Sequence, residues 1–216
     1  MRNENIYIVL DYETGGIDPR DCPPIQLAGI AIDPRKLEPI PGGEFCSMMH
    51  PGDMSKVKDQ ALSVNKKTRA QIEAAPPARV VFDQFVDWCR GFNPRGRSPF
   101  TAPIAVGKNI RNFDWIILCR QCKEGGHLDK MGRPNFLHTR TMLDLEDELL
   151  GWLDGVDDLA DLRMDTLREY FGLSTEQAHD ALTDVRQTAL FLTEFLKLKR
   201  QVREKISLRG SFAGLA

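Results

Sequence analysis

The stretch "IYIVLDYETGG", residues 6–16, places two carboxylates directly behind a run of large apolar side chains. The run, residues 6–10, would bury both faces of an extended chain, which predicts a central strand covered on both sides. Asp11 and Glu13 are two residues apart, so they share one face if the strand continues through them. Two like charges on one face repel each other. The pattern therefore predicts either a bound cation or a hydrated surface at the end of this strand.

The length and net charge of the chain limit the number of domains and the kinds of partner that we expect. The chain has 216 residues, 42% of them apolar, and a formal net charge of −2. We expect a single domain over residues 1–216, with its core at about 6–196 and a basic helix end and tail at about 197–216. A net charge this close to zero creates no strong field toward nucleic acid or membranes, so local charge has to be analysed instead.

The cysteine pattern and the hydropathy indicate the compartment. Five scattered cysteines, an odd number, suit a reducing environment better than a disulfide framework. No apolar run approaches the length of about 20 residues that a membrane span needs. The N-terminal residues before the acid pair show no apolar signal segment. We therefore expect a soluble cytoplasmic protein without a membrane partner.

Apolar periodicity and turn residues predict the order of the elements. Strands are expected at 6–11, 24–33, 43–50, 104–107 and 136–142, with the turn-rich residues 33–43 before the third of them. Helices are expected at 65–73, 78–91 and about 110–123, with further helices to the C-terminus. Strands that cluster early, with helices between and after them, indicate one α/β layer structure.

A further acid, Asp114, falls on an apolar helical stripe. Its neighbours at minus four, plus three and plus four are Ile110, Ile117 and Leu118. A lone buried carboxylate is costly, so Asp114 should be paired or bound to a metal. The alternative is an ordinary acid in the first turn of a helix, where the helix dipole favours it.

The segment "AHDALTD", residues 178–184, carries a histidine and an acid five residues apart. Five steps of about 100° put His179 and Asp184 on different faces of a regular helix. A shared site therefore requires His179 on a loop or first turn and Asp184 inside the helix, with Asp180 as a candidate N-cap. Taken alone, His179 is better explained as a surface histidine or as one with its hydrogen bonds satisfied.

Together these residues predict a particular chemistry. Four carboxylates on apolar elements offer hard oxygen ligands, which suit Mg²⁺ or Mn²⁺ and not zinc. Two such ions about 4 Å apart can hold the attacking and leaving oxygens of a phosphoryl displacement. A nearby imidazole can take a proton from water at neutral pH.

Three motifs in order carry a family resemblance. D-x-E-T stands as Asp11-Tyr12-Glu13-Thr14, an Asn followed by Phe-Asp stands as Asn109 and Phe113-Asp114, and H-x-A-x-x-D stands at 179–184. The chain resembles, over about 6–196, the DEDDh group of DnaQ-like 3′→5′ exonucleases, and "ETGGIDP" resembles their bacterial and phage members. The resemblance implies a ribonuclease H-like α/β fold, with a mixed five-stranded sheet flanked by helices.

The resemblance also implies roles for single residues. Two divalent cations, Mg²⁺ or Mn²⁺, would be held by Asp11, Glu13, Asp114 and Asp184, and His179 would be the general base. The terminal nucleotide would be contacted by Thr14, Gly15, Gly16, Val64, Asn65 and Phe113, although Phe113 fits core packing equally well. The chain departs from the family pattern at Gly15, Asn65 and the position of Asn109, which affects substrate preference and leaves the metal ligands intact.

The implied function is hydrolysis of single-stranded nucleic-acid 3′ ends, with DNA favoured as the substrate and nucleoside 5′-monophosphates as products. Two alternatives stay open: an exoribonuclease of the same chemistry, and a catalytically silent nucleic-acid-binding module. A polymerase or another replication or repair protein is also left open as a partner. The basic run at 197–205 is either a solvated helix end or a phosphate contact. The pair Cys119 and Cys122 is interpreted as packing thiols on a helix.

Overall fold

A mixed five-stranded sheet forms the centre of the molecule. The structure is a computed structural model that describes residues 4–96, 98–175 and 179–205. The strand order is β3-β2-β1-β4-β5, and β1 pairs antiparallel with β2 and parallel with β4. The strands are β1 (Tyr7–Thr14), β2 (Pro24–Asp33), β3 (Glu38–Met48), β4 (Ile104–Gly107) and β5 (Met142–Asp144). The predicted α/β class and the central position of the first strand are confirmed.

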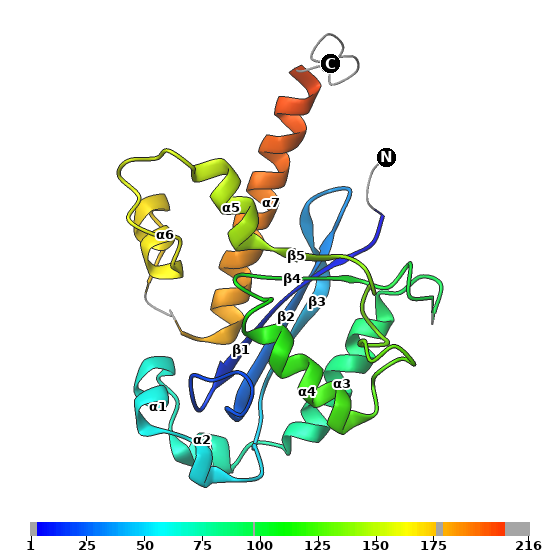
Figure 1. Cartoon of the computed structure of the whole chain (residues 1–216), viewed down its shortest axis with the longest axis vertical. Coiled ribbons are helices and arrows are strands. Elements are labelled where there is room, and N and C mark those ends of the chain that lie inside the picture. Colours follow the sequence, from blue (N-terminus) through cyan, green and yellow to red (C-terminus); the bar gives the residue numbers. More distant parts are fainter. Residues whose placement is uncertain (1–3, 97, 176–178, 206–216) are drawn as a thin grey trace.

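Helices cover both faces of this sheet (Figure 1). They are α1 (Asp59–Asn65), α2 (Arg69–Glu73), α3 (Ala78–Gly91), α4 (Asp114–Gly125), α5 (Leu145–Leu153), α6 (Met164–Phe171) and α7 (Ala181–Lys205), with a short 3-10 helix η1 (Met54–Lys56). Residues 78–91 form the helix that the sequence predicts. Among the described residues, no helix is long and apolar enough to cross a membrane.

Strand β1 supplies alternate side chains to two separate cores. Ile8 and Leu10 pack with side chains of α3 and α4 on one face. Tyr7 and Val9 pack with side chains of α5 and α7 on the other face. Because side chains alternate along a strand, the odd-numbered residues that follow on β1 also point toward the face that α7 covers.

The third strand begins five residues earlier than predicted, at Glu38 instead of residue 43. The sequence "EPIPGG", residues 38–43, lies in the turn-rich stretch 33–43 that is expected to precede this strand. β3 is an edge strand, and an edge strand tolerates proline because one side of its backbone has no ladder partner. The pairing of β2 with β3 is irregular between Ile30 and Ile32, which is where the proline-containing part begins.

The expected single helix at 65–73 is wrong. α1 already ends at Asn65, because Lys66 adopts the left-handed conformation with φ 54°. α2 then starts after Thr68, whose side chain forms a reciprocal capping box with Gln71. The spacing T-x-x-Q at 68–71 is a helix-start signal that the apolar periodicity concealed.

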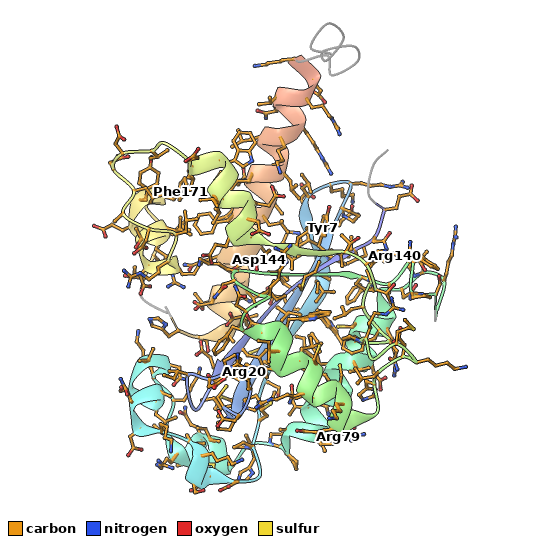
Figure 2. The ribbon with its side chains drawn as sticks, in the orientation of Figure 1. Tyr7, Arg20, Arg79, Arg140, Asp144 and Phe171 are labelled. Atoms are coloured by element: carbon orange, nitrogen blue, oxygen red, sulfur yellow. The ribbon has the colours of Figure 1, made fainter. Side chains whose placement is uncertain are left out.

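Two further element boundaries, both near β5, differ from those that the sequence predicts. The predicted helix at about 110–123 starts at Asp114, because the backbone amides of Asn109 and Arg111 donate to the carboxylate of Asp144 and hold a turn there. Asp144, labelled in Figure 2, is the last residue of β5. Because β5 begins only at Met142, the expected strand at 136–142 is wrong except for that residue.

Candidate active site

Three carboxylates from two elements meet at the end of β1. Strand β1 continues through Asp11 and Glu13, so both point toward the face that α7 covers. Asp184 lies in the first turn of α7. One carboxylate oxygen from each of Asp11, Glu13 and Asp184 lies within 4.8 Å of those of the other two. The strand thus brings together the acids that the sequence predicted to share a face.

The fourth predicted acid, Asp114, approaches from the other helix layer. Asp114 is 3% exposed at the start of α4, and its Oδ1 accepts a hydrogen bond of 3.0 Å from the backbone amide of Tyr12. Tyr12 lies between Asp11 and Glu13 on β1, so this bond ties Asp114 to the same strand end. The expectation that Asp114 is buried is confirmed, and its carboxylate accepts from a backbone amide, whereas its binding to a metal stays a prediction.

The pKa values of these acids are raised mainly by burial, which the charges of neighbouring cations offset only in part. Burial, followed by the neighbouring charge of Asp114, raises the pKa of Asp11 well above its usual range. Burial raises the pKa of Glu13 to about 8 and that of Asp114 to about 7. The pKa of Asp184 is also raised, again mainly by burial. A divalent cation would stabilise the ionised form of these clustered carboxylates, and their oxygen atoms are the ligands that hard divalent cations prefer.

Two side-chain cations border the cluster. Arg168 on α6 is fully buried and its Nη2 donates to Asp184 Oδ1 at 2.5 Å. Lys67, between α1 and α2, donates from Nζ to Asp180 Oδ1 at 2.6 Å, and its charge acts to lower the pKa of Glu13. The sequence pattern predicted neither residue as a partner of the acids.

His179 lies just before α7, as the five-residue spacing requires. Its backbone has φ 67°, and α7 begins two residues later at Ala181. Its Nε2 lies 3.8 Å from Asp165 Oδ2 on α6, and its side chain is 36% exposed. Asp180 accepts hydrogen bonds from Lys67 and from Gln26, which fixes the start of α7 against β2.

A cleft of about 420 Å³ adjoins the acids. Its lining residues come from the end of β1, the loop that follows it, and α1 with the residue before it: Glu13, Thr14, Gly16, Ile17, Lys58, Gln60, Ala61, Val64 and Asn65. Val64 is 52% exposed, whereas Asn65 is buried and its Nδ2 donates to the backbone oxygen of Thr14 at 3.0 Å. Four of the six residues that the resemblance assigns to substrate therefore line one cavity beside Glu13.

The other two substrate candidates lie outside this cleft lining. A side chain at Gly15 would have its Cβ 2.9 Å from Pro23 Cγ and 3.1 Å from Val57 Cα, so packing alone explains the glycine there. Phe113 is partly buried and packs against the core between the sheet and helices α3 and α4. Substrate contacts of Gly15 and Phe113 stay predictions.

Arg168 and Asp144 were not predicted as residues near the site, although the sequence carries an indirect signal for each. Arg168 takes the place of an apolar residue in the stripe formed by Met164, Leu167 and Phe171, and a cation at such a position needs a buried acceptor. Asp144 closes β5, where a carboxylate suits the cap of the next helix, and its side chain accepts from the Glu146 amide. Neither signal identifies the partner across the fold.

Comparison with known families identifies the chain. The family model described as exonuclease, RNase_T, matches residues 8–192. The chain belongs to this exonuclease family. Members of the family are metal-dependent, and the acidic cluster is the candidate place for the metal. A comparison with curated protein sequences finds no match.

Solved structures with the same fold include several nucleases. E. coli exonuclease I in complex with a dT13 oligonucleotide has a TM-score of 0.74 at 17% identity, covering 93% of this chain and 43% of that one. Exonuclease I from Methylocaldum szegediense gives 0.70 at 23%, covering 92% and 41%. Cell-death related nuclease 4 gives 0.71 at 20%, covering 90% and 64%. The chain thus spans less than two thirds of these proteins, and it has their ribonuclease H-like exonuclease fold.

The raised pKa values predict how the metal-free protein responds to pH. A carboxyl group whose pKa is raised by folding contributes stability below its unfolded pKa near 4, and this is lost as pH rises through the folded value. For Asp114 and Glu13 the folded values are about 7 and about 8. We expect the melting temperature in chelator to fall between pH 5 and about 9, and Mg²⁺ to abolish much of this fall.

Thermal melts with chelator or Mg²⁺ across this pH range measure the effect. Glu13→Gln should flatten the metal-free profile, because glutamine has no proton to lose. Asp87→Asn, which changes an exposed carboxylate on α3, is the matched control and should keep the wild-type slope. A wild-type melting temperature that rises with pH in chelator would contradict the prediction.

Proposed function

We propose that this protein is a 3′→5′ exonuclease that hydrolyses phosphodiester bonds at single-stranded 3′ ends, with DNA as its favoured substrate. The observation that carries the proposal is the meeting of Asp11, Glu13 and Asp184 beside a cleft, with His179 at the entrance to α7. Family membership supports exonucleolytic hydrolysis. The complexes of exonuclease I with single-stranded oligonucleotides support the choice of strand and sugar.

The proposed cofactors are two divalent cations, Mg²⁺ or Mn²⁺, held by Asp11, Glu13, Asp114 and Asp184. Such ions stabilise the negative charge that develops on the phosphoryl oxygens. The protein's own contribution is to fix the four carboxylates. β1 sets the spacing of Asp11 and Glu13, the Tyr12 amide orients Asp114, and Arg168 orients Asp184.

His179 is proposed to accept the proton of the attacking water. Its position before α7 leaves the imidazole partly exposed, so solvent can exchange protons with it. Asp165 Oδ2, at 3.8 Å from Nε2, favours a ring orientation in which that nitrogen faces α6. The other ring nitrogen is then the one available to the water, in the neutral form of the ring.

The cleft is proposed to hold the terminal nucleotide. Thr14, Gly16 and Asn65 line the cleft, and Ile17 and Val64 present exposed apolar side chains against which a base can pack. Because Glu13 lines both the cleft and the acidic cluster, a nucleotide in the cleft places its 5′ phosphate next to the carboxylates. This arrangement favours release of nucleoside 5′-monophosphates.

Digestion of matched oligonucleotides tests the proposed function. With Mg²⁺ or Mn²⁺, a 5′-labelled DNA strand should shorten one nucleotide at a time, and a circular single strand should resist. Chelator should stop the reaction. The matched RNA strand should be cut more slowly, and faster cutting of RNA would instead favour the exoribonuclease alternative. Fragments from the middle of the circular strand would contradict exonucleolysis, and binding without cleavage would indicate the silent module.

A further inference from the structure

Arg168 is an arginine buried beyond the reach of solvent next to the acidic site. All of its nitrogens donate to side-chain oxygens: Nη2 to Asp184 Oδ1 at 2.5 Å, Nη1 to Asp165 Oδ1 at 2.6 Å, and Nε to Gln187 Oε1 at 2.7 Å. The exposed fraction of the residue is 0%. Arginine is almost never fully buried unless it is paired, and here its bonds to Asp184 and Gln187 connect α6 to the first turns of α7.

The pairing of Arg168 involves a carboxylate of the cluster itself. Asp184 belongs to the group of three acids that lie within 4.8 Å of one another. Its Oδ1 is therefore already bonded to a guanidinium, whose charge is permanent. A divalent cation that approaches Asp184 meets a carboxylate that is partly neutralised, and it also meets the repulsion of the nearby positive charge.

We propose that Arg168 is a resident cation of the active site, that is, a permanent positive charge of the protein's own. It holds Asp184 in place before metal binds, and it weakens the binding of divalent cations to the carboxylate of Asp184. The inference rests on the proposed function. Among the described residues, no side-chain cation forms an ion pair with Asp11 or Glu13, and the nearby Lys67 pairs with Asp180 instead. The Asp184 side should fill completely only when the phosphates of a nucleic acid add their negative charge.

A purely structural arginine would behave differently. If Arg168 served only to pack α6 against α7, its loss would lower the melting temperature without changing the affinity for metal. If Arg168 is a resident cation, removing its charge should lower the melting temperature of the metal-free protein and raise the affinity for a divalent cation. This combination separates the two roles.

The experiment is a calorimetric titration of metal-free protein with Mn²⁺ in the absence of nucleic acid. Arg168→Gln should bind Mn²⁺ at least about tenfold more tightly than the wild type, because a nearby positive charge is gone. Arg168→Lys keeps the charge and should stay within about threefold of the wild type. Arg186→Gln is the matched control, because it removes a cation from α7 whose partner is Glu44, and it should leave the Mn²⁺ affinity unchanged.

The outcomes distinguish this inference from the proposed function. Equal or weaker Mn²⁺ binding by Arg168→Gln overturns the resident cation and leaves the exonuclease proposal intact. No Mn²⁺ binding by the wild type, with or without an oligonucleotide, overturns the metal assignment itself. If Arg168→Gln does not fold, Asp184→Asn and Asp11→Asn decide instead. Asp184→Asn should lose less Mn²⁺ affinity than Asp11→Asn, and an equal or larger loss contradicts the inference.

Discussion

Asp11→Asn abolishes nucleic-acid hydrolysis while the protein stays folded. Asp11 is surrounded by Asp114, Glu13 and Asp184, whose charges all raise its pKa, so it lies at the centre of the acidic cluster. An asparagine of the same shape removes a charged ligand and leaves the packing of β1 unchanged. We expect the rate to fall by at least about 10³-fold, as is typical when charge stabilisation at the reacting phosphate is lost.

The melting temperature of Asp11→Asn is the second half of this prediction. In chelator it should equal or exceed that of the wild type, because a buried group under repulsion has been replaced by a neutral one. With Mg²⁺ the wild type should gain stability and the variant should gain less. Asp87→Asn, on the exposed side of α3, is the control for both measurements. Full activity of Asp11→Asn, purified free of host nuclease, would contradict the assignment of Asp11.

His179→Ala lowers the rate of hydrolysis by about 10²- to 10⁴-fold, the usual scale for loss of a general base. The histidine stands outside the carboxylate cluster, so its loss should leave the Mn²⁺ affinity within error of the wild type. Asp114→Ala should lose both rate and Mn²⁺ affinity, because that carboxylate is oriented toward β1 by the Tyr12 amide.

Single-turnover rates and Mn²⁺ titrations of the two variants measure the contrast. His50→Ala serves as a control, since the ring of His50 accepts a hydrogen bond from the Gly52 amide between β3 and η1. Its rate should match the wild type. If His179→Ala keeps the wild-type rate, the histidine is a bystander and the water is activated by another group.

The sequence was most informative where one periodicity governs several residues. Alternation along β1 predicted that Asp11 and Glu13 share a face, and the helical stripe around Asp114 predicted that this acid is buried. The spacing of His179 and Asp184 predicted a loop before the last helix. Each of these inferences needed only local geometry, which the amino-acid pattern determines.

The inferences that failed depended on partners distant in sequence. Whether the prolines of residues 38–42 form a turn or an edge strand depends on β2 beside them. Whether the helix starts at residue 110 or at Asp114 depends on Asp144, about thirty residues later, which holds the turn at Asn109. The partners of Arg168 on α7 could not be assigned either, since a stripe position indicates that a side chain is buried but not what it meets.

The basic run at 197–205 illustrates the same limit. It forms the end of α7, and three of its cations already have partners within the chain: Lys197 with Glu194, Lys199 with Glu148, and Arg200 with backbone oxygens of residues 34 and 35. These contacts favour the interpretation as a helix end. A phosphate contact at this run stays a prediction.

Anomalous scattering from Mn²⁺ in a crystal of the wild-type protein tests the central claim most directly. A crystal soaked with Mn²⁺ and a nucleoside 5′-monophosphate should show anomalous density between the carboxylates of Asp11, Glu13 and Asp184, with the phosphate beside it and the base in the cleft next to Val64. Mn²⁺ density only at other carboxylates, with the nucleotide outside the cleft, would contradict the account.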